Sequence, residues 1–179
     1  MRIALVLTAT ALVALVGCSK EKPAGSSEPK APDTKSPVVS AIKVEKPQVD
    51  TADGATKHLE GDHFALDLET KGCKVGAECA MTIKLGIQGD FHINKEYPYR
   101  YVASDTAGVE YLGKGEKNKF TKEAGDFVAN GEKAGVMTVK FKPTTAGKMK
   151  LTGVYKMSLC SADQCQIEEP NLELTVPAS

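Results

Sequence analysis

Length and charge leave room for one folded domain and give no sign of nucleic-acid binding. The chain has 179 residues, and its 23 Lys and Arg side chains balance its 23 Asp and Glu side chains. No basic patch stands out, so nucleic acid is not an expected partner. No Ser-His-Asp spacing, Gly-rich phosphate loop or carboxylate pair is present, so the sequence predicts no hydrolase or transferase site.

Residues 1–17 are typical of an export signal. Arg2 gives a positive start, and residues 3–16 are apolar, a run too short to cross a bilayer. Residues 15–18 resemble the bacterial lipobox, in which cleavage precedes a cysteine that then receives lipid. We expect Cys18 to hold the mature chain on a membrane, although an ordinary signal with an accidental cysteine is the alternative. Ser19 then predicts a place in the cell envelope, on the outer membrane where two membranes exist, facing the periplasm or exterior.

Residues 18–57 are expected to form a flexible tether after the lipidated cysteine. Five prolines are spread through Ser, Lys, Glu, Ala and Thr, with few aliphatic residues to bury. Such a composition does not offset the entropy of ordering the chain, and its proline content favours a semi-extended linker.

Residues 58–179 have the strand signals of one all-β domain. Apolar and polar residues alternate at residues 64–69, 81–87 and 137–142, residues 97–102 are aromatic and β-prone, and short turn signals separate these runs. This pattern predicts a β-sandwich of about seven or more antiparallel strands. Residues 118–129 are the one place where a helix is conceivable, and Gly125 weakens that interpretation.

The cysteine count fits an exported chain. If Cys18 takes lipid, four cysteines remain, and an oxidising compartment favours disulfides among them. Four cysteines allow three pairings, of which the nearest-neighbour one is simplest. We interpret Cys73 and Cys79 as a structural disulfide. The spacings do not suit zinc, so no metal site is predicted.

Residues 148–169 predict a strand, a turn and a return strand. Met149, Leu151, Tyr155 and Met157 share one phase of a period of two, whereas Cys160 belongs to the polar phase. Four polar residues then form a turn before Cys165. Two cysteines that flank such a turn can face each other at a distance that a disulfide closes.

Together with a second motif, this hairpin resembles a known family. Residues 89–98 hold His92, Asn94, Tyr97 and Pro98 in one loop after a strand. With the later hairpin, this order is similar to the N-terminal, immunoglobulin-like periplasmic domain of the thiol:disulfide interchange protein DsbD and its relatives. The resemblance covers about residues 60–179. In this chain residues 166–170 replace the proline pair that usually follows the second cysteine.

The resemblance implies an immunoglobulin-like fold and a redox role for Cys160 and Cys165, with a periplasmic thioredoxin-like protein as partner and no cofactor. The motif-loop residue His92 is expected to orient its loop by hydrogen bonding. The transporter's membrane-spanning and thioredoxin-like parts have no counterpart here, because no apolar run of about 18 residues follows the signal.

Two other functions remain open on sequence grounds. The chain is alternatively a non-catalytic binding or structural lipoprotein of the envelope whose disulfides only stabilise the fold. A weaker alternative is copper binding through methionine and cysteine. Each candidate methionine occupies the apolar phase of a strand, which favours core packing. The thiols lack a strong activating cation, since Lys156 is the nearest one and Asp163, Glu168 and Glu169 oppose it.

Overall fold

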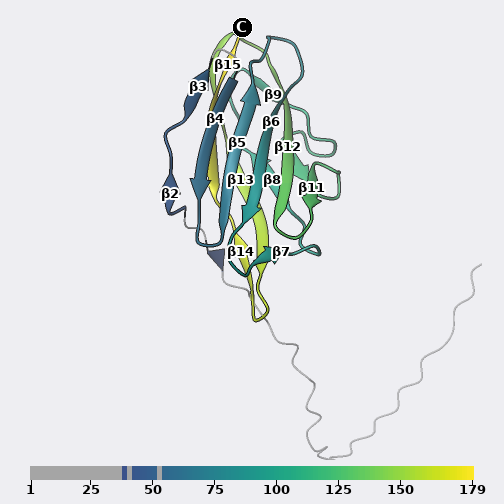
Figure 1. The fold of residues 1–179 in the computed structure, drawn as a ribbon. Helices are drawn as coiled ribbons and strands as arrows, with labels where there is room; N and C mark the ends of the chain where they lie inside the picture. The colour runs from purple at the N-terminus through teal and green to yellow at the C-terminus, as the bar shows by residue number, and fades with distance from the viewer. Residues whose placement is uncertain (1–37, 40–41, 52–53) are drawn as a thin grey trace, which may run out of the picture. The chain divides into compact units, whose positions relative to one another are not determined.

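The computed structural model describes residues 38–39, 42–51 and 54–179, and every regular element in these residues is a β-strand. The strands form two sheets that pack face to face (Figure 1). The predicted all-β sandwich is therefore confirmed. The expected signal peptide, Cys18 and most of the expected tether lie outside the described residues.

One sheet has eight strands in the order β11-β12-β6-β5-β4-β2, with β3 also paired to β4 and β9 to β12. Its pairs are antiparallel. The strands are β2 (Val44–Glu45), β3 (Val49–Thr51), β4 (Gly54–Glu60), β5 (Phe64–Lys71), β6 (Cys79–Ile87), β9 (Val109–Tyr111), β11 (Phe127–Asn130) and β12 (Ala134–Pro143).

The other sheet has seven strands in the order β1-β14-β13-β8-β10, and β7 and β15 also pair with β13. Strand β1 runs parallel to β14, whereas the other pairs are antiparallel. The strands are β1 (Val38–Val39), β7 (His92–Ile93), β8 (Arg100–Ala103), β10 (Lys119–Thr121), β13 (Gly147–Cys160), β14 (Cys165–Glu168) and β15 (Asn171–Ala178).

Strand β13 organises the seven-stranded sheet, because four other strands pair with it. Its apolar phase is buried as the alternation predicts, from Met149 to Leu159. At the end of the strand the polar phase is buried as well, since Ser158 is 1% exposed and Cys160 is 7% exposed. Other segments must therefore cover both faces of the sheet at the cysteine end of β13.

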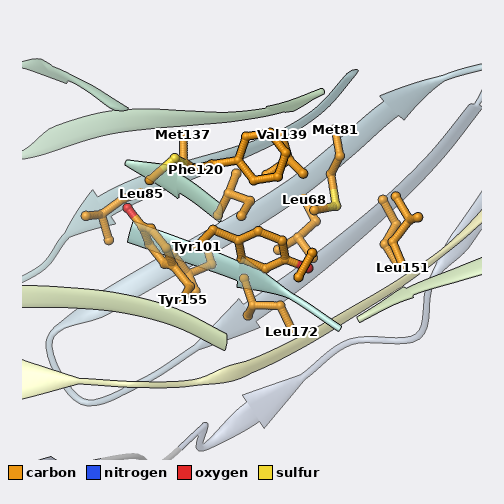
Figure 2. Packing of buried hydrophobic residues seen from close by; sticks show 14 of the residues in the cluster. Leu68, Met81, Leu85, Tyr101, Phe120, Met137, Val139, Leu151, Tyr155 and Leu172 are labelled. Atoms are coloured by element: carbon orange, nitrogen blue, oxygen red, sulfur yellow. The ribbon is translucent and has the colours of Figure 1, made fainter. Parts of the chain in front are cut away.

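The core between the sheets is aromatic and aliphatic. Tyr99, Tyr101 and Tyr155 are fully buried. Figure 2 shows the rings of Tyr101 and Tyr155 among aliphatic side chains such as Leu85 and Leu172. The hydroxyl groups of Tyr101 and Tyr155 have no hydrogen-bond partner among the described residues.

The sandwich extends N-terminally of the expected domain boundary at residue 58. Strands β2 and β3 both pair with β4, which itself begins at Gly54. Lys43 and Lys46 add main-chain hydrogen bonds to Glu60 and His58. Residues 42–51 are poor in apolar residues, but main-chain pairing to a sheet edge does not require an apolar side chain.

Residues 118–129 contain two strands and a turn in place of the conceivable helix. Strand β10 leads into a turn in which Asp126 accepts a hydrogen bond from the main-chain N–H of Thr121. The Thr121 hydroxyl accepts another from the main-chain N–H of Ala124. Gly125 has φ of 79°, a left-handed conformation that favours glycine and ends any helix.

Candidate functional site

The Cys160–Cys165 hairpin forms one end of the sandwich (Figure 1). Strand β13 ends at Cys160 and β14 begins at Cys165, and the two residues are direct cross-strand partners. Their Cα atoms are 4.0 Å apart and their sulfurs form a disulfide. The pairing expected from the sequence is thus the one that the structure shows.

The turn between the cysteines is closed by Ser161. Its main-chain N–H donates to the carbonyl of Gln164 at 2.8 Å. Its hydroxyl accepts from the main-chain N–H groups of Asp163 and Gln164 at 3.2 and 3.3 Å. Residue pairs along an antiparallel ladder alternate between main-chain hydrogen-bonded and non-hydrogen-bonded ones. Since Ser161 and Gln164 form a hydrogen-bonded pair, the next pair, Cys160 and Cys165, is a non-hydrogen-bonded one. Side chains approach most closely at such pairs, which favours the disulfide.

The two cysteines differ in exposure. Cys160 is buried, whereas Cys165 is half-buried and follows exposed turn residues 162–164. On the side away from β14, Cys160 pairs with His92 of β7. A protein thiol that approaches the hairpin therefore reaches the sulfur of Cys165 more easily than that of Cys160.

The motif loop at residues 92–98 lies against the cysteine end of β13. The main-chain N–H of Asn94 donates to the carbonyl of Ser158 at 3.1 Å, and its side-chain amide donates to the Ser158 hydroxyl at 3.3 Å. The hydroxyl of Tyr99 donates to the same carbonyl at 2.5 Å. These contacts explain why Ser158 is buried although it belongs to the polar phase of β13.

The other motif residues have smaller roles. Tyr97 packs edge-on against Tyr99, with ring centroids 5.6 Å apart, while Pro98 is exposed. His92 is placed by its main chain, since its ring forms no hydrogen bond with any described residue. Asn94 supplies the hydrogen bonds that hold the loop against β13, and the expected orienting role of the His92 side chain stays a prediction.

Lys156 does not activate the cysteines. Its ammonium group donates to a carboxylate oxygen of Glu169 at 2.7 Å. It lies four residues from Cys160 along an extended strand, a separation of about 13 Å. Lys156 therefore offers no close positive charge to a Cys160 thiolate.

Glu168 is a buried carboxylate, which the sequence did not indicate. It is 2% exposed, and one carboxylate oxygen, Oε2, has no hydrogen-bond partner among the described residues. Burial raises its pKa to about 7. Glu168 is opposite Met157 in the apolar phase of β13, whereas Cys165 is opposite Cys160 in the other phase. The carboxylate and the disulfide thus lie on opposite faces of the sheet.

The second disulfide, Cys73–Cys79, joins the end of β5 to the start of β6. Cys73 is buried and forms an isolated bridge with Ala178. The main-chain N–H groups of Ser179 and Val75 donate to the carbonyls of Cys73 and Ser179, each at 3.0 Å. These contacts support a structural role, because the disulfide fixes the segment to which the last residues of β15 attach.

The described residues contain no cluster of three or more metal-binding side chains. The imidazole of His58 lies between the carboxylates of Asp67 and Glu60, at 2.5 and 2.7 Å. His63 instead stacks on Phe91, with ring centroids 3.9 Å apart. Core packing accounts for the four methionines considered for copper, which are 0–5% exposed: Met81, Met137, Met149 and Met157.

Sequence reasoning missed Tyr99, Ser158 and Glu168. Tyr97, Tyr99 and Tyr101 share one phase of a period of two, so the sequence alone could have indicated that Tyr99 faces the same side as its two neighbours. The side chain of Glu168 belongs to the buried side of β14. This is apparent only from the register between β14 and β13, in which Glu168 pairs with Met157.

No helix in the described part of the chain is long and apolar enough to span a membrane. No model of a known protein family matches the chain, and no curated protein matches it.

Proposed function

We propose that this chain is an exported, lipid-anchored envelope protein that exchanges the Cys160–Cys165 disulfide with thiols of a partner protein. The partner is a thioredoxin-like protein outside the cytoplasm, and Cys18 carries the lipid. One observation carries the exchange function: the disulfide joins a buried cysteine to a half-exposed one at the tip of a hairpin. A purely structural disulfide has no need of an accessible sulfur.

The reduction potential of the Cys160–Cys165 pair tests this proposal. We expect a value in the range of known exchange proteins, between about −270 and −120 mV. A Cys73→Ala/Cys79→Ala variant removes the other disulfide, so that the measurement reports on one pair. A potential below about −300 mV would mark a structural bond and contradict the exchange function.

The anchor has its own test. A Cys18→Ser variant is expected to appear in the soluble fraction after cell lysis, while a Cys73→Ser variant remains with membranes. Retention of Cys18→Ser on membranes would contradict lipidation at this residue.

A non-catalytic envelope protein is the second candidate. It is favoured by the ion pair between Lys156 and Glu169, because Lys156 is the basic residue nearest to Cys160 in the sequence and this contact engages its charge. In this case both disulfides stabilise the fold, and each would contribute about 2 kcal/mol for loops of this size.

A further inference from the structure

We propose that His92 serves the Cys160 sulfur as acid and base: its imidazolium pairs with the thiolate that Cys160 becomes when the Cys160–Cys165 disulfide opens, and gives it a proton. This role rests on the proposed exchange function. It supplies the positive charge that Lys156 does not bring to the cysteines.

His92, Cys160 and Cys165 form one lateral row across strands β7, β13 and β14 (Figure 1). Direct cross-strand partners point to the same face of a sheet. Ile93, the next residue of β7, is buried in the core opposite Leu159, so His92 points to the other face, where the disulfide lies. The imidazole therefore stands on one side of the Cys160 side chain, and Cys165 stands on the other.

The spacing within this row suits a contact between the imidazole and the sulfur. Because the pair Cys160–Cys165 is non-hydrogen-bonded, the main chain of Cys160 faces β7, and hydrogen-bonded partners lie about 5.5 Å apart between Cα atoms. The ladder continues at Asn94 and Ser158, whose side chains form a hydrogen bond of 3.3 Å. Partners in this ladder thus bring polar side-chain atoms together on this face of the sheet.

The ring of His92 is free to make this contact. It is half-buried and forms no hydrogen bond with another residue that the structure describes. The other two histidines of the chain are engaged, since His58 lies between two carboxylates and His63 is stacked on Phe91. In the described part of the chain, no carboxylate competes with Cys160 for the His92 ring.

The segments that adjoin this end of β13 carry charges of both signs. Their charged side chains are Asp90, Lys95, Glu96, Arg100, Glu132, Lys133, Lys156, Asp163, Glu168 and Glu169. Glu168 lies on the opposite face of the sheet, and Glu169 is paired with Lys156. The other carboxylates in this set are exposed to solvent, which screens their effect on the histidine ring.

The basic side chains in this set do not stand beside the disulfide. Lys156 and Arg100 are cross-strand partners four residues from Cys160 along β13. The ammonium group of Lys133 donates to two main-chain carbonyls of the turn that precedes His92. Among the residues that the structure describes, His92 is thus the basic side chain that the strand register places directly beside Cys160.

The exchange step balances without another reagent. A thiolate of the partner forms a bond to the Cys165 sulfur, the Cys160–Cys165 bond breaks, and its electron pair remains on Cys160. The His92 imidazolium pairs with this thiolate and transfers its proton to it, becoming a neutral imidazole. In reverse, the imidazole takes the proton back and the Cys160 thiolate attacks the mixed disulfide at Cys165. Pairing with an imidazolium makes a thiolate a better leaving group.

The first test measures the ionisation of Cys160 in the full-length chain. Cys165→Ala leaves Cys160 as a free thiol, and mass spectrometry of its peptide follows alkylation by iodoacetamide as a function of pH. Adding His92→Gln should raise the midpoint of this profile by about one pH unit or more. His92→Lys keeps a positive charge and should hold the midpoint below that of His92→Gln.

His63→Gln is the matched control, because it removes a histidine that is stacked on Phe91 and should leave the midpoint unchanged. Loss of the fold would accelerate the alkylation of Cys160 at every pH and is thus distinguished from a shifted midpoint. A midpoint that is the same with and without His92 would overturn the proposed role.

The second test measures exchange itself on the oxidised chain, with glutathione as the thiol. The rate of mixed-disulfide formation in the parent, divided by that in His92→Gln, should be about threefold or more at pH ~5.5. The ratio should fall toward one as the pH rises to ~8.5, because a histidine loses its charge in this range. Equal rates at every pH would overturn the role of His92 and leave the exchange function intact. A disulfide inert to glutathione would overturn the exchange function, and the role with it.

Discussion

Tyr101 lies directly over Gly153, so that the ring occupies the space where a side chain at residue 153 would stand. A Cβ atom at Gly153 would lie 2.5 Å from both the Cζ and the hydroxyl oxygen of Tyr101. The two residues are diagonal neighbours, because Gly153 pairs with Ala103 and Tyr155 with Tyr101. The glycine in the middle of β13 is thus required by an aromatic ring on the adjacent strand.

We predict that Gly153→Ala lowers the free energy of unfolding by about 1–3 kcal/mol, because the added Cβ would overlap both the fully buried ring of Tyr101 and the main-chain oxygen of Val102. Gly86→Ala is the matched control in strand β6, where a Cβ meets nothing within 4 Å. Urea unfolding of the two variants measures the difference. An equal effect at both positions would contradict the packing argument.

The buried tyrosines provide a second prediction. Tyr99 donates a hydrogen bond to Ser158, whereas the hydroxyl of Tyr155 has no partner among the described residues. Tyr99→Phe should therefore destabilise the fold by about 1 kcal/mol, and Tyr155→Phe should be neutral or stabilising. Chemical denaturation checks the sign of each change. A loss at Tyr155 as large as that at Tyr99 would indicate a partner for its hydroxyl.

His58 should make stability depend on pH. The hydrogen bond that His58 donates to Asp67, and then the one that it donates to Glu60, raise the pKa of His58 above its ordinary value of 6.5. A raised histidine pKa stabilises the fold fully below pH 6.5, and this contribution is lost as pH rises through the folded-state pKa. Thermal unfolding of His58→Gln should show a shallower decline above pH 6.5 than the parent chain.

A matched pair tests the cause of this shift. Asp67→Asn should lower the pKa of His58 more than Glu60→Gln does, because Asp67 makes the larger contribution. NMR titration of the His58 ring reports the pKa directly. The reverse order would contradict the assignment of Asp67 as the dominant partner.

Glu168 should also make the fold less stable as the pH rises. Burial raises its pKa from 4.5 to about 7, so the folded chain holds a proton that the unfolded chain releases. Stability is then retained below pH 4.5 and lost as pH rises through 7, by about 3 kcal/mol when deprotonation is complete. Glu168→Gln should be more stable than the parent at pH 8.5. Glu169→Gln, which removes a neighbouring carboxylate, should keep the parent's pH profile.

The two cysteines should behave differently in trapping experiments. Cys160→Ala is expected to accumulate a mixed disulfide with a partner through the half-exposed Cys165, since no resolving thiol remains. Cys165→Ala should accumulate little, because Cys160 is buried beside His92. Non-reducing electrophoresis of cell extracts shows the adducts. Equal trapping by both variants would refute the asymmetry, and no trapping by either would favour the structural role.

The hairpin could be predicted because its signals are local. The alternation in residues 149–159 and the four polar residues between Cys160 and Cys165 determine strand, turn and pairing within one stretch of chain. The Cys73–Cys79 disulfide was predictable for the same reason. Short sequence separation leaves few competing partners for each cysteine.

The surroundings of the hairpin depend on contacts between distant segments. The burial of Ser158 requires Asn94 and Tyr99, which lie about 60 residues earlier, and the pairing of β1 with β14 joins residues about 130 apart. Periodicity identifies the phase of a strand but not the strand that lies beside it. The position of His92 beside Cys160 is likewise a contact between segments far apart in the chain.

The parallel pairing of β1 determines how the domain would respond to mechanical load. Because β1 runs parallel to β14, Val38 lies toward the hairpin end, whereas β15 finishes at the opposite end, where Ala178 pairs with Gly147. Force applied between Val38 and Ser179 would therefore act along the strands. The eight residue pairs between β13 and β15 would be loaded in shear, all at once, instead of being unzipped one after another. Stretching the chain from an N-terminal attachment should thus meet its strongest resistance at the C-terminal strand.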